Sequence, residues 1–134
     1  KQEPTKSEYY RAKGSLYEKM NQPEKAEEMY IKTLDLNPGD FFAQYNLGNI
    51  HLNRVIEAHK VVQDIVDAKE YNAALDKVME QYEAVIPYFE KALELNPKDK
   101  NTLTTLKELY FRLRTKNKTY QEKYDATMAT LNSL

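Results

Sequence analysis

LDLNPGD at residues 34–40 returns almost unchanged as LELNPKD at residues 93–99, and this repeated stretch decides the fold. Each copy closes an amphipathic run that carries Ala and Leu, and each is followed by another run of helical periodicity. Proline lacks a backbone donor and pushes the residue before it out of the α region, so each copy ends a helix. The same stop used twice predicts a helical unit that is repeated along the chain.

The composition predicts a single helical domain and excludes several classes of function. Of the 134 residues, 41% are hydrophobic, 31% are charged and only three are glycine. The 20 basic and 21 acidic residues are well mixed, which predicts no attraction for a phosphate backbone and therefore no nucleic-acid partner. The chain has no cysteine, so disulfides and thiolate metal sites are excluded. No apolar run reaches the roughly 20 residues that a membrane span needs.

Periodicity and helix-breaking residues predict six helices. The first covers about residues 5–20, the second begins at Pro23 and ends before Pro38, and the third begins at Phe41 behind an Asp40 cap. A break is expected within residues 67–72, and the last two helices cover about residues 101–114 and 119–131. Pro87 should kink the fourth helix or mark a junction in it. That helix carries an apolar seam at spacings of three and four: Tyr71, Leu75, Val78, Tyr82, Val85, Phe89 and Leu93.

Three sets of residues resemble the tetratricopeptide repeat, a helix–turn–helix unit of 34 residues with the pattern W-x₂-L-G-x₂-Y, A-x₃-F and P. The first set is Tyr10, Gly14, Tyr17, Ala26 and Tyr30, followed by Pro38. The second set is Leu47, Gly48, His51, Val85, Phe89 and Ala92, followed by Pro97, and the third is Leu103, Leu106 and Tyr110. Gly14 and Gly48 fall where paired helices would come closest.

The resemblance implies an all-α fold of helical hairpins, stacked as a short right-handed solenoid in one domain over residues 1–134. The units are about 7–40, 41–99 and 100–134, and the last is a capping pair. Pro38 and Pro97 are 59 residues apart, so about 25 residues are extra against a repeat of 34. Shared between two arms, they would lengthen each helix of the middle hairpin by roughly 18 Å.

The middle hairpin is more apolar than one seam requires, at Val55, Ile56, Val61, Val62, Ile65 and Val66. One alternative is that these side chains all pack within the hairpin. The other is that one face contacts a second chain, which makes a homo-oligomer through the 50–90 hairpin possible.

In the family that the chain resembles, the first helix of each unit lines a concave face that binds peptides or helices. Residue by residue, that face would include Arg11, Phe42, Tyr45, Asn49, Leu52, Glu108 and Phe111. We expect Phe42, Tyr45 and Phe111 to be exposed and to serve as aromatic anchors, a residue type enriched in interface hot spots. The alternative is that these rings pack against the long hairpin or a neighbouring repeat.

Some members of the family hold a chaperone's C-terminal carboxylate with basic and Asn residues. Arg11 and Asn46 match two of the five clamp positions, which places Asn46 among the candidate partner-binding residues. Ser15, Asn101 and Thr105 occupy the other positions and supply no second or third cation. A carboxylate would lack its charge-assisted bonds, so a chaperone tail is not the expected ligand.

The sequence predicts no catalytic, cofactor or metal site, and therefore not an enzyme. His51 and His59 are eight residues apart, whereas zinc-binding pairs on a helix are four apart. We expect His51 to fill a tyrosine's packing position and His59 to be exposed. Acidic neighbours such as Glu27 and Glu28 are expected to form solvated helix faces.

The predicted function is therefore a non-catalytic scaffold that binds a protein or peptide on its concave face. The alternative is a structural or capping segment of a larger repeat protein, or a self-association module built on the long hairpin. IPYFEKALELNPKD at residues 86–99 also resembles bacterial tetratricopeptide proteins in which such a unit belongs to a larger, exported protein. We thus expect a bacterial origin and, as one possibility, a periplasmic location, although no residue fixes the compartment.

Overall fold

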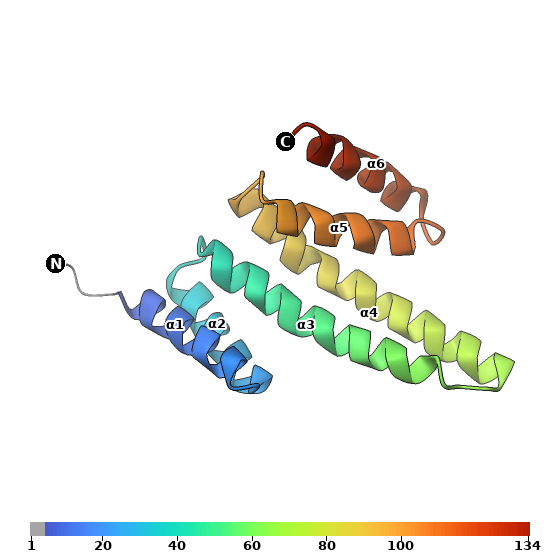
Figure 1. Ribbon diagram of the computed structural model, residues 1–134, viewed down its shortest axis with the longest axis horizontal. Helices are drawn as coiled ribbons and strands as arrows, with labels where there is room; N and C mark the ends of the chain where they lie inside the picture. The colour runs from blue at the N-terminus through green and yellow to red at the C-terminus, as the bar shows by residue number, and fades with distance from the viewer. Residues whose placement is uncertain (1–4) are drawn as a thin grey trace.

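The computed structural model describes residues 5–134, which form six α-helices and no strand (Figure 1). The helices are α1 (Lys6–Lys19), α2 (Pro23–Leu36), α3 (Phe41–Val62), α4 (Ala68–Leu95), α5 (Lys100–Leu113) and α6 (Lys118–Asn132). α1 packs on α2, α3 on α4 and α5 on α6, and the three pairs meet through α2–α3 and α4–α5 contacts. The predicted all-α fold of stacked helical hairpins is confirmed.

Short polar side chains fix where most helices begin. Thr5 and Glu8 form a reciprocal capping box at α1, and Pro23 occupies the first turn of α2, as predicted. The Asp40 carboxylate accepts a hydrogen bond from the Ala43 backbone N–H at 3.0 Å and caps α3. The aspartate that ends each copy of the repeated stretch, Asp40 or Asp99, therefore caps the next helix.

The break between the two long helices lies earlier than the sequence predicts. α3 ends at Val62 and α4 begins at Ala68, whereas the break was expected within residues 67–72. The Asp67 carboxylate accepts a hydrogen bond from the Glu70 backbone N–H at 2.9 Å and caps α4. Residues 68–70 are thus the exposed first turn of α4 rather than a loop.

α3 and α4 extend past their neighbours on one side of the molecule (Figure 1). They have 22 and 28 residues, whereas the other four helices have 14 or 15. Relative to a helix of 14 residues, α3 gains 8 residues and α4 gains 14, or about 12 Å and about 21 Å. The extra length was expected to be shared equally between the two helices, and this prediction is wrong. α4 also continues for two turns past Pro87, so a junction at that proline is wrong.

Two apolar clusters hold the helices together. The smaller one lies between the first two pairs and includes Ala26, Tyr30, Ala43, Leu47 and Ile50. The larger one joins α3, α4 and α5, and it contains the predicted α4 seam, of which Val78, Tyr82, Val85 and Phe89 are buried. Burial of these rings and branched side chains is the main favourable term in folding. Within residues 5–134, no helix is both long enough and apolar enough to span a bilayer.

Both predicted glycine crossings are confirmed. A Cβ added at Gly14 would lie 2.6 Å from the Tyr30 ring of α2, and one at Gly48 would lie 3.1 Å from the Phe89 ring of α4. The two glycines therefore let paired helices approach until an aromatic ring touches the opposite backbone.

Candidate functional site

The first helix of each pair presents one face at spacings of three and four residues. On α3 this face carries Phe42, Tyr45, Asn49 and Leu52, and the same positions on α5 are Asn101, Thr104, Glu108 and Phe111. Phe42 is 60% exposed and Phe111 is 46% exposed, and both are large apolar rings. Two of the three expected aromatic anchors are therefore open to solvent.

Tyr45, the third expected anchor, is half-buried and packs inward. Its ring stacks on Phe41 with centroids 5.8 Å apart and meets the edge of Phe89 at 5.7 Å. Leu52 likewise packs against the larger apolar cluster. The prediction of an exposed Tyr45 is wrong, because α4 lies behind this part of α3 and brings Phe89 beneath the ring.

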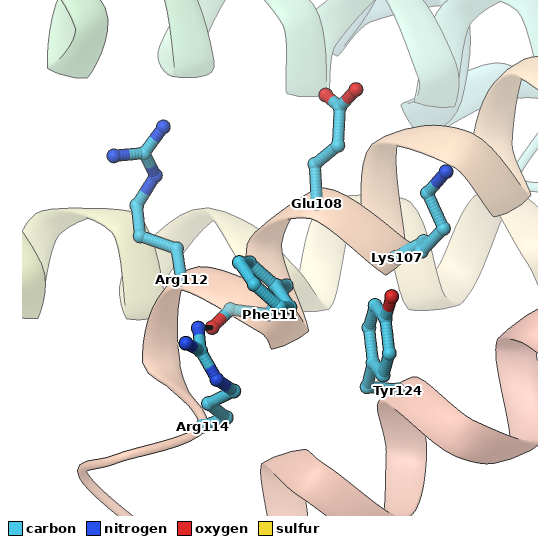
Figure 2. A pocket seen from close by; sticks show the side chains of 6 residues that line it. All are labelled: Lys107, Glu108, Phe111, Arg112, Arg114 and Tyr124. Atoms are coloured by element: carbon cyan, nitrogen blue, oxygen red, sulfur yellow. Dashed lines mark hydrogen bonds between the residues drawn. The ribbon is translucent and has the colours of Figure 1, made fainter.

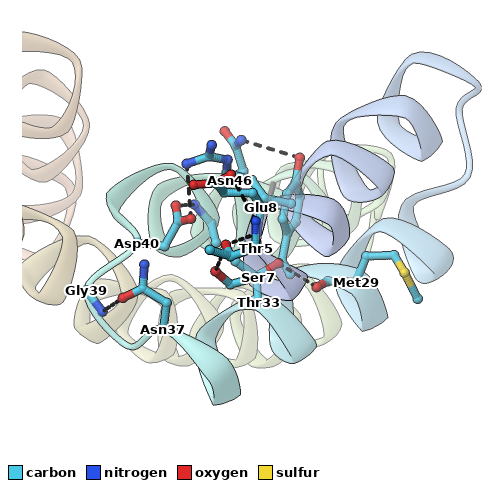
Figure 3. Close-up of polar contacts among 12 residues, drawn as sticks. Thr5, Ser7, Glu8, Met29, Thr33, Asn37, Gly39, Asp40 and Asn46 are labelled. Carbon is cyan, nitrogen blue, oxygen red and sulfur yellow. Dashed lines mark hydrogen bonds and ion pairs between the residues drawn. The ribbon is translucent and has the colours of Figure 1, made fainter. Parts of the chain in front are cut away.

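Arg11 ties α1 to the start of α3. Its guanidinium donates to the Asp40 carboxylate at 3.1 Å, while the other oxygen of that carboxylate caps α3. The same guanidinium lies 5.8 Å from the centre of the Phe42 ring. Asp40 is buried at the centre of these contacts (Figure 3). Arg11 therefore holds the base of the Phe42 ring and is committed to an ion pair within the chain.

Asn46 is also engaged by neighbouring helices. Its amide donates to the Tyr30 hydroxyl at 3.3 Å, and that hydroxyl donates to the Glu18 carboxylate at 2.5 Å. Burial, together with the Glu18 carboxylate, raises the pKa of Tyr30 above its ordinary value, which keeps the phenol protonated. Asn46 lies on the predicted face, but its amide is used to satisfy a buried hydroxyl. Asn49 lies one turn further along α3 and is half-buried.

A pocket of about 430 Å³ opens between α5 and α6 (Figure 2). It contains two of the predicted residues, Glu108 and Phe111. It also contains four residues that the sequence reading missed: Lys107, Arg112, Arg114 and Tyr124. Lys107, Phe111 and Arg114 follow one another at spacings of four and three on the same chain segment. That helical spacing was available as a signal for the pocket.

Aromatic rings and one backbone oxygen hold the two arginines of this pocket. The Arg114 guanidinium lies 3.7 Å from the centre of the Phe111 ring and donates to the Phe111 carbonyl oxygen at 2.7 Å. The Phe111 ring is tilted against Tyr124 at 5.3 Å, and the Arg112 guanidinium lies 4.5 Å from the Tyr82 ring of α4. Rings thus keep both guanidiniums in place without a carboxylate.

His59 lies beside the same α4 tyrosine. Its Nδ1 is 2.8 Å from the Tyr82 hydroxyl oxygen, and the imidazole is half-buried rather than exposed, so the prediction for His59 is wrong. Burial and the nearby Arg112 guanidinium hold the pKa of His59 below its ordinary value. The tertiary contact with α4 explains the error, since no signal within α3 identifies it.

Several acidic residues join neighbouring segments of the chain. Glu27, expected on a solvated face, accepts from Arg54 at 2.8 Å and from His51 at 2.9 Å, and the Arg54 hydrogen bond lowers its pKa. The His51 ring stacks on Tyr88 at 4.6 Å, so its predicted packing role is confirmed. Among residues 5–134, no group of three or more potential metal ligands comes together.

The hairpin tip is the second candidate surface. Val55 and Val62 are buried against α4, as internal packing predicts. Val61 and Val66 are exposed, and Val66 reaches 98%. Part of the hairpin's apolar surface therefore packs internally, and a small apolar tip remains exposed and open to a second chain.

Comparison with known proteins identifies the repeat. Residues 7–40 and 79–99 match the tetratricopeptide repeat. The human protein O-mannosyl-transferase TMTC3 is 35% identical over 100 residues, which are 75% of this chain and 8% of that protein. The chain therefore spans a small part of the curated relative that it matches.

The IFIT1 fold has a similar helical arrangement. An IFIT1 monomeric mutant in complex with Gppp-AAAA superposes with a TM-score of 0.67 at 18% identity, over 93% of this chain and 25% of that chain. MamA from Desulfovibrio magneticus RS-1 matches over 95% of this chain and 76% of that chain at 24% identity, with a TM-score of 0.39. The repeat match over residues 7–40 and 79–99 and the six helices identify this chain as an all-α helical-repeat protein with a tetratricopeptide-like fold.

Proposed function

We propose that this protein is a non-catalytic scaffold that binds a protein or peptide segment on the face formed by α1, α3 and α5. The observation that supports this proposal most directly is the exposure of Phe42 and Phe111 on the first helices of two successive pairs. Each ring is held by a guanidinium of its own chain, Arg11 or Arg114. A pre-positioned ring loses little conformational entropy when an apolar ligand side chain covers it.

The proposal does not extend to RNA or to glycosyl transfer. The net charge of −1 provides no continuous track of cations for phosphates, so we do not carry over the Gppp-AAAA ligand of the IFIT1 structure. Transferase activity is named for TMTC3 as a whole, of which this chain matches 8%. The absence of catalysis is part of the proposal, and it is supported by the pairing of acidic side chains such as Glu27 and Glu83 with basic residues of the chain.

Selection of random peptides tests the proposal. A displayed peptide library is enriched on the full chain, and the selected peptides are then measured against Phe42→Ala/Phe111→Ala and against Ile31→Ala. Ile31 is a matched control, because it is an exposed apolar side chain on α2. We expect affinity to fall about 10-fold or more in the double variant and to stay unchanged in the control. Failure to enrich any peptide, or equal affinity in all three proteins, would contradict the proposal.

A second candidate function is a structural one, as a segment of a longer helical array. α1 exposes Tyr9, Leu16 and Met20 along one stripe. The equivalent positions of α5 are 93 residues further along the chain and hold Thr102, Leu109 and Leu113. For Tyr9 and Leu16, the equivalent positions of α3 are 34 residues further along and hold Ala43 and Ile50. All five of these later residues are buried where α5 packs on α4 and α3 packs on α2. The α1 stripe is thus suited to cover a preceding helix.

This second candidate is tested by the mass of the protein in solution. If the stripe or the hairpin tip mediates self-association, sedimentation should give about twice 15.8 kDa, and Leu16→Glu or Val66→Glu should restore the monomer. If the protein is a monomer at all concentrations, self-association is wrong. The structural candidate is then limited to a segment that stacks within a longer parent chain. An origin in a larger bacterial, exported protein stays a prediction.

A further inference from the structure

The α5–α6 pocket combines aromatic surface with cations that no carboxylate neutralises. Its walls carry Lys107, Arg112 and Arg114 beside the single acidic residue Glu108. Among residues 5–134, none of the three cations has a carboxylate oxygen within 4.0 Å. Elsewhere in the chain, basic side chains form ion pairs with acidic side chains of other segments, such as Lys116 with Glu83 and Lys123 with Glu90. The pocket is therefore a local excess of positive charge on a nearly neutral protein.

The two arginines are positioned for a ligand that carries a negative charge. A guanidinium has five N–H donors, and Arg114 uses one of them on the Phe111 carbonyl oxygen. The Phe111 ring and the Tyr82 ring restrain the guanidiniums of Arg114 and Arg112, respectively. The remaining donors can form paired hydrogen bonds with a carboxylate, and restraint by the rings reduces the entropy that binding would cost.

The pocket also has room for an apolar side chain. Phe111 and Tyr124 lie 5.3 Å apart at its floor, and Figure 2 shows both rings between Arg114 and Lys107. The volume of about 430 Å³ is in the range of small ligand sites. Figure 2 also shows Glu108 and Arg112 extending from α5 on the same side, with Glu108 between Arg112 and Lys107 in this view.

We propose that the α5–α6 pocket binds an acidic peptide segment. Its carboxylates pair with Arg112 and Arg114, and an aromatic or aliphatic side chain between them covers Phe111 and Tyr124. This inference rests on the proposed function and adds the class of ligand to it. Glu108, between Arg112 and Lys107, repels the ligand's acidic groups and so contributes to where they lie along the pocket.

A peptide fits this pocket better than a nucleic acid does. Base stacking on Phe111 with phosphates on the arginines is the competing arrangement, but RNA needs a row of cations along its backbone. On the α4 side of Arg112, the adjoining surface carries Asp76 and Glu80, which would repel a continuing phosphate backbone. A short acidic segment needs only the local cations.

Fluorescence anisotropy with defined probes tests the inference. The probes are a labelled peptide of Asp and Glu around a central Phe-Leu pair, the same peptide with Asn and Gln in place of the acids, and an oligoadenylate RNA. The full chain is compared with Arg112→Gln, Arg114→Gln, Glu108→Gln and Phe42→Ala/Phe111→Ala. Arg54→Gln serves as the matched control, since Arg54 pairs with Glu27 away from the pocket. Circular dichroism of each variant verifies that it is folded.

We expect the acidic peptide to bind, and its affinity to fall about 10-fold in each of Arg112→Gln and Arg114→Gln. Glu108→Gln should strengthen binding, Arg54→Gln should leave it unchanged, and an ionic strength raised from about 0.05 M to about 0.5 M should weaken it. If the arginines only stabilised the fold, Glu108→Gln would not increase the affinity for the acidic peptide.

The other outcomes overturn the inference in distinguishable ways. Equal binding of the acidic and amide peptides, with loss only in Phe42→Ala/Phe111→Ala, would reject the acidic ligand and leave the scaffold proposal standing. Binding of the RNA in preference to the acidic peptide would reject a peptide ligand at this pocket. No binding of any probe, together with no enrichment in the peptide library, would reject both proposals.

Discussion

The ring of Tyr30 lies directly under the backbone of Gly14, so close that a Cβ at residue 14 would be 2.6 Å from the ring carbon Cε1. Tyr30 is fully buried, and its hydroxyl is held by Glu18 and Asn46. The ring therefore cannot swing aside to make room. This contact sets the spacing of the first helix pair.

Gly14→Ala should destabilise the protein although alanine is the better helix former. The gain in helix propensity is about 1 kcal/mol, and overpacking against a fixed ring costs about 1–3 kcal/mol. We expect a net loss of about 1 kcal/mol in the free energy of unfolding, measured with urea. Gly39→Ala is the control, since its Cβ would be 3.5 Å from the Asn37 side chain, an ordinary contact. Equal stability of the two variants would contradict the packing argument.

Leucines at equivalent positions of α1 and α5 should differ strongly. Leu109 is 3% exposed and packs in the larger cluster, whereas Leu16 is 55% exposed. We expect Leu109→Ala to lower the free energy of unfolding by about 2–5 kcal/mol and Leu16→Ala to change it by less than about 0.5 kcal/mol. A large and concentration-dependent loss in Leu16→Ala would instead show that another chain covers the α1 stripe in solution.

Acidification should destabilise the protein partly through His59. Its pKa in the folded chain is below the unfolded value of about 6.5, so between these two values the unfolded chain binds more protons. Stability therefore falls as the pH falls through that window. We expect the melting temperature to drop less between about pH 7.5 and about pH 5.5 in His59→Gln than in the wild type. His51 is present in both proteins, so an identical drop would mean that His59 does not contribute.

Glu83 should couple α4 to α6. It accepts hydrogen bonds from the Tyr120 hydroxyl and from Lys116, and burial together with Glu83 raises the pKa of Tyr120 to about 12. A double-mutant cycle of Glu83→Gln and Tyr120→Phe should give a coupling energy of about 1 kcal/mol, since both side chains are partly exposed.

The pH dependence of this coupling has a defined sign. The pKa of Glu83 is lowered in the folded chain, chiefly by Lys116 and then by Tyr120. The stabilisation is therefore complete above the unfolded pKa of about 4.5 and is lost as the pH falls through the folded pKa. A cycle that gives no coupling at neutral pH would show that this contact does not hold α6 to α4.

The sequence predicts the helix pairs well, because their signals are local. Three of these signals act within one or two helical turns: the Asn-Pro stops, the Asp40 cap and the Tyr30 ring four residues after Ala26. Each lies where it was expected. The break after Val62 was placed too late because polarity alone does not distinguish a loop from an exposed first turn. The Asp67 cap supplies that distinction.

The candidate site was predicted less completely, because it depends on contacts between distant segments. Tyr45 is covered by Phe89, which lies 44 positions further along, and His59 is paired with Tyr82 of α4. The α5–α6 pocket needs Tyr124 from another helix to complete the surface around Phe111. Helical spacing identifies which residues share a face, but only the packing of α4 and α6 decides which of them remain open.

Backbone chemical shifts test the central claim most directly. A peptide selected from the library is titrated into the isotopically labelled chain, and the amide shifts are mapped by NMR. The account predicts that the largest shifts lie on α3 and α5, around Phe42, Asn49, Glu108 and Phe111. Shifts confined to α2, or to the hairpin tip at Val61 and Val66, would contradict it.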